Sequence, residues 1–144
     1  MPQRMKDFGR QNLWRIYQTI TTAGDLIEGS VLVPATETNM LEIVAQNWKA
    51  ACFEGRNADV TDTTTFKIYG SRKYMEAVPA TGDSFWTPSG AHWTLLDTQA
   101  TVTASTNTTA VVHENKNYTY YLVTAQAAPT KDTLTICRAV LSQN

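Results

Sequence analysis

The stretches YTYYLVTA (residues 118–125) and TLTICRAVL (residues 133–141) decide the fold class of this chain. Both are rich in β-branched and aromatic residues, which favour β-strands. The segment PTKD (residues 129–132) lies between them and has the residue types of a turn. Because so short a connection joins antiparallel neighbours, this part of the chain is expected to form paired antiparallel strands.

The second stretch is expected to occupy a central position in its sheet. Its apolar positions change from Leu134 and Ile136 to Cys137, Ala139 and Leu141. Such a change indicates either a bulge near Ile136 or a strand that is buried on both faces. Burial on both faces is the simpler interpretation, and it favours a central strand.

Further strand signals precede this pair. Apolar and polar residues alternate over residues 16–20, 27–33, 66–69 and 100–104, and two valines lie within residues 109–114. In the last third of the chain these signals are about 10–15 residues apart, which leaves no room for crossover helices. The sequence therefore predicts a mainly all-β chain with an antiparallel sandwich or barrel rather than a parallel sheet.

Residues 38–54 are ambiguous. Leu41, Val44, Trp48 and Ala51 recur at the spacing of a helix face, and one short helix is an alternative here. The same segment also alternates as strands do, and Gln46 and Asn47 are suited to break it in two. Two strands are the favoured interpretation.

Composition and charge exclude some classes of partner. Only 17% of the 144 residues are charged and the net charge is -1, so there is no electrostatic footprint for nucleic acid. No stretch approaches the ~18 apolar residues of a membrane span, and the first ten residues lack the apolar run of a secretory signal. Cys52 and Cys137 form no zinc pattern. Two buried thiols on adjacent strands are expected, and a disulfide between them stays open.

The first 13 residues are expected to form a basic N-terminal arm ahead of a single domain at residues 14–144. Cations alternate there with a few apolar groups, so the arm is interpreted as a disordered tail, a strand that docks on a neighbouring subunit, or a nucleic-acid arm. The docking interpretation makes candidate partner-binding residues of Arg4, Lys6, Phe8, Arg10 and Trp14.

No catalytic motif is found. His92 and His113 are the two imidazoles of the chain, and neither lies beside a nucleophile motif such as Gly-x-Ser-x-Gly. Phosphate-binding glycine patterns are missing as well. We therefore expect a protein that is not an enzyme and that needs no metal or cofactor.

The aromatic residues between positions 71 and 92 and just beyond are the most informative. Prolines and glycines exclude regular structure there, and so long a loop in a small domain is usually functional. Tyr74, Trp86 and Trp93 are candidate binding residues, because aromatic faces on loops suit sugar stacking or protein contact. The alternative is that Trp86 and Trp93 cap one end of the core.

Residues 14–141, with runs such as TFKIYGS (residues 65–71) and WTLLD (residues 93–97), resemble the capsid decoration (cement) proteins of tailed phages. That resemblance implies a jelly-roll-like β-sandwich, a trimer or dimer that binds capsid protein subunits without catalysis. It also implies synthesis in the host cytoplasm and a place on the capsid surface of the virion.

The same runs also look like stretches of discoidin-like and other ligand-binding sandwiches. A carbohydrate-binding or adhesin-type β-sandwich of a phage fibre or tail is therefore the rival prediction, with a glycan as the partner. In that case Tyr74, Trp86 and Trp93 would form a stacking platform.

Overall fold

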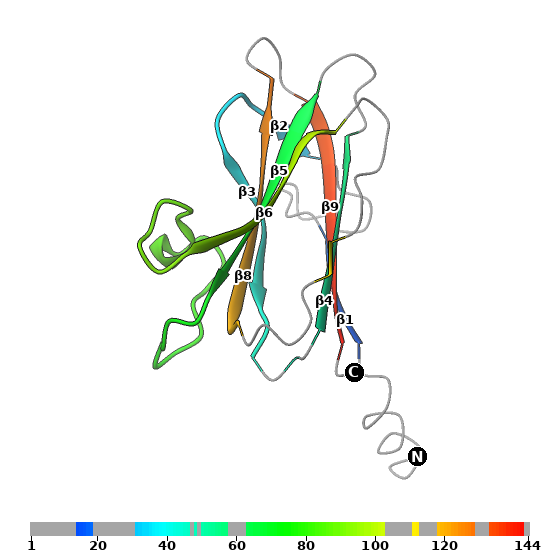
Figure 1. Cartoon of the computed structure of the whole chain (residues 1–144). Coiled ribbons are helices and arrows are strands. Elements are labelled where there is room, and N and C mark those ends of the chain that lie inside the picture. Colours follow the sequence, from blue (N-terminus) through cyan, green and yellow to red (C-terminus); the bar gives the residue numbers. More distant parts are fainter. Residues whose placement is uncertain are drawn as a thin grey trace.

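Figure 1 presents the computed structural model of the chain. It describes residues 14–18, 31–46, 48, 50–57, 63–102, 111–112, 118–128 and 133–142. Side chains are described for residues 33–46, 48, 50–55, 63–99, 118–128 and 137–141.

The described residues form nine strands and one short 3₁₀ turn, η1. In chain order these elements are β1 (Trp14–Gln18), β2 (Val31–Val33), β3 (Thr38–Val44), β4 (Ala50–Asn57), β5 (Thr64–Ser71), η1 (Ser84–Trp86), β6 (Thr94–Val102), β7 (Val111–Val112), β8 (Tyr120–Ala127) and β9 (Thr133–Ser142). The prediction of a mainly all-β chain is confirmed.

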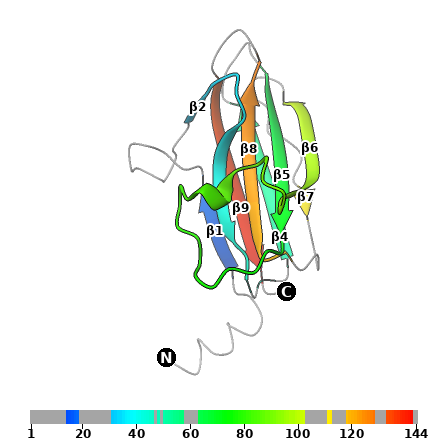
Figure 2. The same ribbon diagram turned by 90° about the vertical axis from the view of Figure 1, so that its left-hand side faces the viewer.

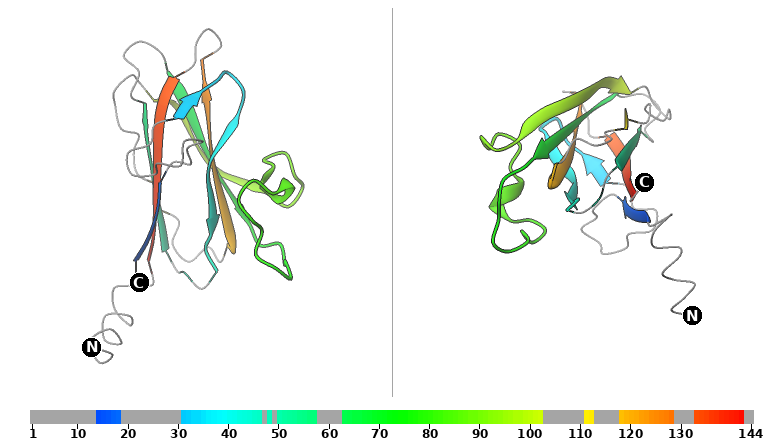
Figure 3. Two further views of the ribbon diagram at one scale, coloured as in Figure 1. Left: turned by 180° about the vertical axis from the view of Figure 1, so that it is seen from behind. Right: turned by 60° about the horizontal axis from the view of Figure 1, so that its bottom comes forward.

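The strands form two antiparallel sheets that face each other (Figure 3). The β9 sheet has the order β1-β9-β4-β7, with β2 also paired to β9, and the β8 sheet has the order β3-β8-β5-β6. Because β8 and β9 lie in different sheets, the expected pairing of residues 118–125 with residues 133–141 is wrong. The pairs β2–β9, β3–β8, β4–β7 and β5–β6 are nested like one long hairpin that has been rolled up. This nesting defines a jelly roll, so the expected jelly-roll-like sandwich is confirmed.

The expected central position of the last strand is confirmed. β9 lies between β4 on one side and β1 and β2 on the other. Its register with β4 runs from Thr135 to Ser142 without a shift, so the alternative of a bulge near Ile136 is wrong. Cys137, Ala139 and Leu141 are buried on the core side, whereas Arg138 between them is exposed. The expected burial of this strand on both faces is therefore wrong at Arg138.

The helix alternative for residues 38–54 is wrong, because this segment forms β3 and β4. A register shift between Asn39 and Leu41 places two consecutive residues, Met40 and Leu41, in the core. β-branched Ile43 follows at strand spacing and is also buried. The pairing of β3 with β8 therefore overrides the helical spacing of the apolar residues.

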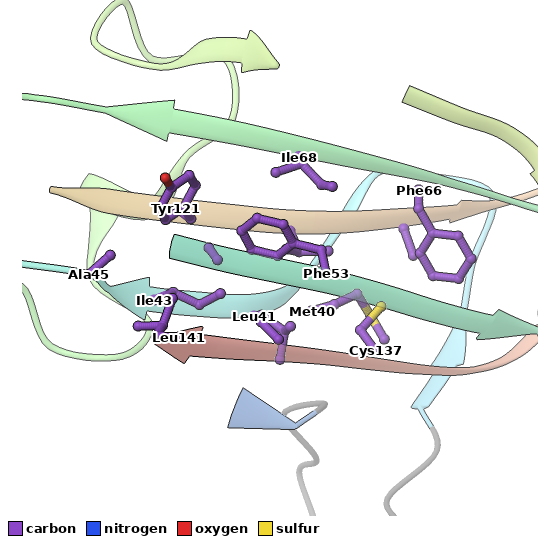
Figure 4. Packing of buried hydrophobic residues seen from close by; sticks show 14 of the residues in the cluster. Met40, Leu41, Ile43, Ala45, Phe53, Phe66, Ile68, Tyr121, Cys137 and Leu141 are labelled. Atoms are coloured by element: carbon purple, nitrogen blue, oxygen red, sulfur yellow. The ribbon is translucent and has the colours of Figure 1, made fainter. Parts of the chain in front are cut away.

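The main core lies between the two sheets (Figure 4). Phe53 of β4 packs against Tyr121 of β8 with ring centroids 5.2 Å apart. Gly55 leaves room for Phe66, because a Cβ at residue 55 would lie 2.8 Å from the Phe66 ring. The two sheets can therefore approach closely at this point.

The cysteines lie on adjacent strands, as expected, but they cannot form a disulfide with each other. Cys137 pairs with Gly55 and points into the core, whereas Cys52 pairs with Val140 and lies on the opposite face of the β9 sheet. A disulfide needs its two Cβ atoms about 3.5–4.5 Å apart, and opposite faces of one sheet do not allow this. The expectation that both thiols are buried holds for Cys137, while Cys52 is half-buried.

Candidate functional site

The connection from β5 to β6, residues 72–93, folds back over the outer face of the β8 sheet (Figure 2). We call it the aromatic loop. Phe85 packs edge-on against Tyr120 at 4.9 Å, and Trp86 stacks with Trp93 at 5.7 Å. These residues form a second hydrophobic cluster with strand residues of the sheet, namely Tyr69, Tyr120 and Leu122. The loop therefore carries a small core of its own.

Local hydrogen bonds shape the part of the loop that carries the aromatic rings. Gly82 has a positive φ of 84°, which suits glycine. The Asp83 carboxylate accepts a hydrogen bond from the Phe85 N–H at 2.9 Å and so caps η1. The Trp86 indole Nε1–H donates to the Ala80 carbonyl at 2.9 Å. The chain is thus turned so that the rings point at the sheet.

A polar latch joins the loop to edge strand β3. The Glu42 carboxylate accepts hydrogen bonds from the Gly82 N–H at 2.7 Å and from the Asn39 Nδ2 at 3.1 Å. The Asn39 amide also donates to the Trp86 carbonyl at 2.5 Å. Two neighbouring side chains of β3 therefore hold both the start and the end of the turn that carries η1.

His92 is part of the loop's own packing. Its ring stacks on Phe85 at 4.6 Å, and its Nε2 lies 3.1 Å from the Phe85 carbonyl. The same carbonyl accepts a hydrogen bond from the Trp93 Nε1 at 2.9 Å. The surroundings of His92 are thus two aromatic rings and a backbone oxygen.

A second polar cluster lies on the same face of the β8 sheet. Glu37 Oε2 accepts hydrogen bonds from Tyr69 Oη at 2.5 Å and from Thr124 Oγ1 at 2.6 Å. Burial, followed by the hydrogen bond and the charge of Glu37, raises the pKa of Tyr69 well above its ordinary value. The phenol therefore stays protonated and remains a hydrogen-bond donor.

The predicted binding residues of the loop separate into two groups. Trp86 is 2% exposed and Trp93 is 8% exposed, so neither offers an open ring face for stacking. Both cover the outer face of the β8 sheet rather than one end of the main core, which corrects the core-cap alternative in position. Tyr74 is 83% exposed, and Val78 on the same loop is 59% exposed.

Of the predicted residues of the N-terminal arm, the structure describes only the backbone of Trp14. Trp14 begins β1, where its Cα pairs with Ser142, and its side chain is not described. Arg4, Lys6, Phe8 and Arg10 lie outside the described residues, as does His113. The arm's role therefore stays a prediction.

The hydrophobic cluster between the aromatic loop and the β8 sheet was missed by the sequence interpretation, although a signal for it exists. Residues 120–125 are buried without interruption, and only part of them faces the main core. Tyr120 and Leu122 face the loop instead. A near-continuous run of apolar residues indicates a strand covered on both faces, so something had to cover β8 from outside.

The described residues include no group of three or more His, Cys, Asp or Glu side chains that could hold a metal ion. None of them forms a helix long and apolar enough to cross a membrane.

Comparison with known proteins gives a likeness in fold. No protein-family model matches the sequence, and the search of curated proteins finds no match. Among solved structures, the chain is similar to a chain of the Bacillus endospore appendages, which are described as "a novel family of disulfide-linked pili". The two are 12% identical, with a TM-score of 0.51 over 92% of this chain and 89% of that chain.

Proposed function

We propose that this chain is a non-enzymatic structural subunit that binds copies of itself and a larger protein assembly through protein–protein contacts. The position of the exposed apolar side chains carries this proposal. Tyr74 and Val78 lie four residues apart on the aromatic loop, and Leu95, 50% exposed, lies on edge strand β6. Among the residues with described side chains, these are the large exposed apolar ones. Apolar groups on projecting segments suit contact with another protein.

The loop is well suited to present these groups. The Glu42 latch and the aromatic cluster hold the part of the loop that follows Tyr74 and Val78, so little conformational entropy is lost when a partner binds. Arg72 lies 4.0 Å from the centre of the Tyr118 ring, which anchors the start of the loop. A ligand-binding cleft would expose large aromatic rings, but the rings of Phe85, Trp86 and Trp93 are buried in internal packing.

Two assemblies are candidates. The first is a tailed-phage capsid, where the subunit would decorate the virion surface as its sequence resemblance implies. The second is a fibre built from copies of this chain, and the likeness in fold to a Bacillus endospore appendage supports it.

Covalent links between copies are not part of the proposal. The pili of the comparison are described as disulfide-linked. This chain has two cysteines, of which Cys137 is buried in the core. Burial and the nearby Glu54 charge raise the pKa of the half-buried Cys52, although Arg138 acts in the opposite direction. A raised pKa disfavours the reactive thiolate.

The proposal is tested with a paired change on the loop. Tyr74→Ser combined with Val78→Ser should lower the affinity for assembly by roughly tenfold or more without altering the thermal melt. Thr81→Ala combined with Ser89→Ala changes two exposed polar residues of the same loop and should have no effect. Light scattering of the pure protein and pelleting with assembled capsids measure the two kinds of association.

The outcomes separate the candidates. Filaments of the pure chain in electron micrographs favour the fibre, and pelleting with capsids favours the decoration protein. A chain that is monomeric at every concentration and binds no shell contradicts both.

The carbohydrate-binding alternative now depends on Tyr74 as its exposed ring. A glycan array that shows binding by the unchanged protein and none by Tyr74→Ala would favour it over the structural proposal.

A further inference from the structure

Strands β1 and β2 lie along the same edge of β9 (Figure 2). The Cα atoms of β1 pair with residues 138–142, and those of β2 pair with residues 133–135. Both strands are antiparallel to β9, so they run in the same direction. Together they fill one position of the jelly roll.

The link between these two strands is longer than the fold requires. Gln18 pairs with Arg138 and Val31 pairs with Thr135, so only two residues of β9 separate the two partners. A continuous edge strand would bridge this gap with two residues, yet the sequence has twelve, residues 19–30. Twelve extended residues span up to about 40 Å. The connection is therefore long enough for the β1 and the β2 that pair with one β9 to come from two different chains.

We propose that the edge of β9 at residues 138–142 accepts strand β1 of a second copy of this chain. The proposal deepens the proposed function, on which it rests, by naming the contact that joins two subunits. An exchanged β1 would form the same backbone ladder in the same register, so exchange changes the contacts little.

The surroundings of β9 support this edge as the acceptor. The other side of β9 is paired with β4 along Ala50–Asn57, so a strand can add only on the β1 side. The pairing itself identifies the donor, since Trp14–Gln18 already fit this edge. Residues 1–13 directly precede β1, so an exchanged strand would carry the basic arm onto the neighbouring subunit.

A cross-link between two differently labelled copies tests the exchange. One preparation carries Gln18→Cys and the other carries Arg138→Cys, both in a Cys52→Ser background. Residues directly opposite in an antiparallel pair have Cβ atoms about 4.5–5.5 Å apart, close to disulfide distance. The two preparations are unfolded, mixed, refolded together and oxidised with oxidised glutathione. Disulfide-linked dimers are then counted on non-reducing gels and identified by mass spectrometry.

The matched control mixes Gln18→Cys with Glu54→Cys. Glu54 pairs with Arg138 from the other side of β9 and forms an ion pair with it at 2.6 Å. Arg138→Cys and Glu54→Cys therefore break the same ion pair. A cysteine at residue 54 would be two strand spacings, about 10 Å, from β1, which is too far for a disulfide.

Exchange predicts roughly tenfold or more cross-linked dimer with Arg138→Cys than with Glu54→Cys, because paired thiols have a high effective concentration. Equal yields in the two mixtures would overturn the proposal and place β1 on its own chain. Sedimentation of the unmodified protein keeps the two proposals apart. Assembly without the specific cross-link contradicts exchange alone, whereas the cross-link in a protein that stops at dimers supports exchange and contradicts the fibre.

Discussion

At the scale of single residues, the aromatic side chains of the loop contribute to stability more than to an open surface. Trp86 is buried among Phe85, Trp93 and Tyr120 on the outer face of the β8 sheet. Its indole N–H also holds the Ala80 carbonyl. Removal of this ring should therefore leave a cavity and cost one hydrogen bond of the Ala80 carbonyl, which also accepts from the Asp83 N–H at 3.1 Å.

Trp86→Ala is expected to lower the free energy of unfolding by about 3–5 kcal/mol. Tyr74→Ala, an aromatic truncation at an exposed position of the same loop, should change it by less than about 0.5 kcal/mol. Urea denaturation of the two variants beside the unchanged protein measures both values. Similar small losses in the free energy of unfolding for both variants would show that the hydrophobic cluster under the loop does not hold the loop.

Tyr121 links stability to alkaline pH. Burial, then the neighbouring Tyr118, raise the pKa of Tyr121 to about 12, and Arg72 acts in the opposite direction. Between pH 10 and pH 12 the unfolded chain has lost this proton while the folded chain keeps it, so stability falls as pH rises.

Tyr121→Phe removes this ionisable group from the main core. From pH 10 to pH 12, the free energy of unfolding of the variant should decline less steeply than that of the unchanged protein. The difference in slope corresponds to at most about one bound proton. Chemical denaturation of the variant and of the unchanged protein at a series of pH values gives the slopes, and identical slopes would refute the assignment to Tyr121.

At the scale of elements, the strands were predictable because their signals are local. Period-two alternation and β-branched residues identified β8 and β9, and the change of apolar face in β9 indicated its central position. The pairing of β1 and β2 along one edge was not predictable, because it depends on residues a hundred or more positions away. The opposite orientations of Cys52 and Cys137 follow from another long-range pairing, the register of β4 with β9.

The aromatic loop was predictable as a feature but not as a structure. Its prolines, glycines and aromatic rings mark it as unusual in the sequence. Whether Trp86 and Trp93 face solvent or protein depends on the outer face of β8, to which they are connected only through the fold. Tyr74 on the same loop is 83% exposed and does not belong to the hydrophobic cluster of the loop.

The latch between β3 and the loop gives a prediction at this scale. Glu42→Ala removes the acceptor of the Gly82 N–H, so hydrogen exchange at Gly82 should become faster. Glu42→Gln keeps an oxygen acceptor and should preserve most of the protection. Exchange monitored by NMR distinguishes the two variants. Unchanged protection at Gly82 in Glu42→Ala would mean that the aromatic cluster alone fixes the loop.

At the scale of the whole molecule, the jelly roll separates a stable body from the segments proposed to make contacts. The main core lies between the sheets, and the second core fastens the loop to the outside of the β8 sheet. The proposed contacts lie elsewhere, at Tyr74 and Val78 of the loop, along the edge of β9 and in the basic arm. Folding and assembly should therefore respond to different changes.

Deletion of residues 2–12 tests this separation. The arm has three cations and one anion in this range, so its proposed partner is an acidic surface of a neighbouring subunit. The deletion should leave the melting temperature nearly unchanged and weaken assembly, with the larger effect at low salt, where charge attraction is least screened. A thermal melt beside a pelleting assay at two salt concentrations provides the comparison. A strongly lowered melting temperature would instead make the arm part of the fold.

Sedimentation velocity of the full-length chain over a wide range of concentrations tests most directly whether the protein is an assembly subunit. The account predicts that the average sedimentation coefficient rises with concentration beyond that of a 16.0 kDa monomer. The rise should shrink for Tyr74→Ser combined with Val78→Ser and persist for the control pair Thr81→Ala and Ser89→Ala. A single monomeric species at every concentration for all of these proteins would contradict the claim that this chain binds copies of itself.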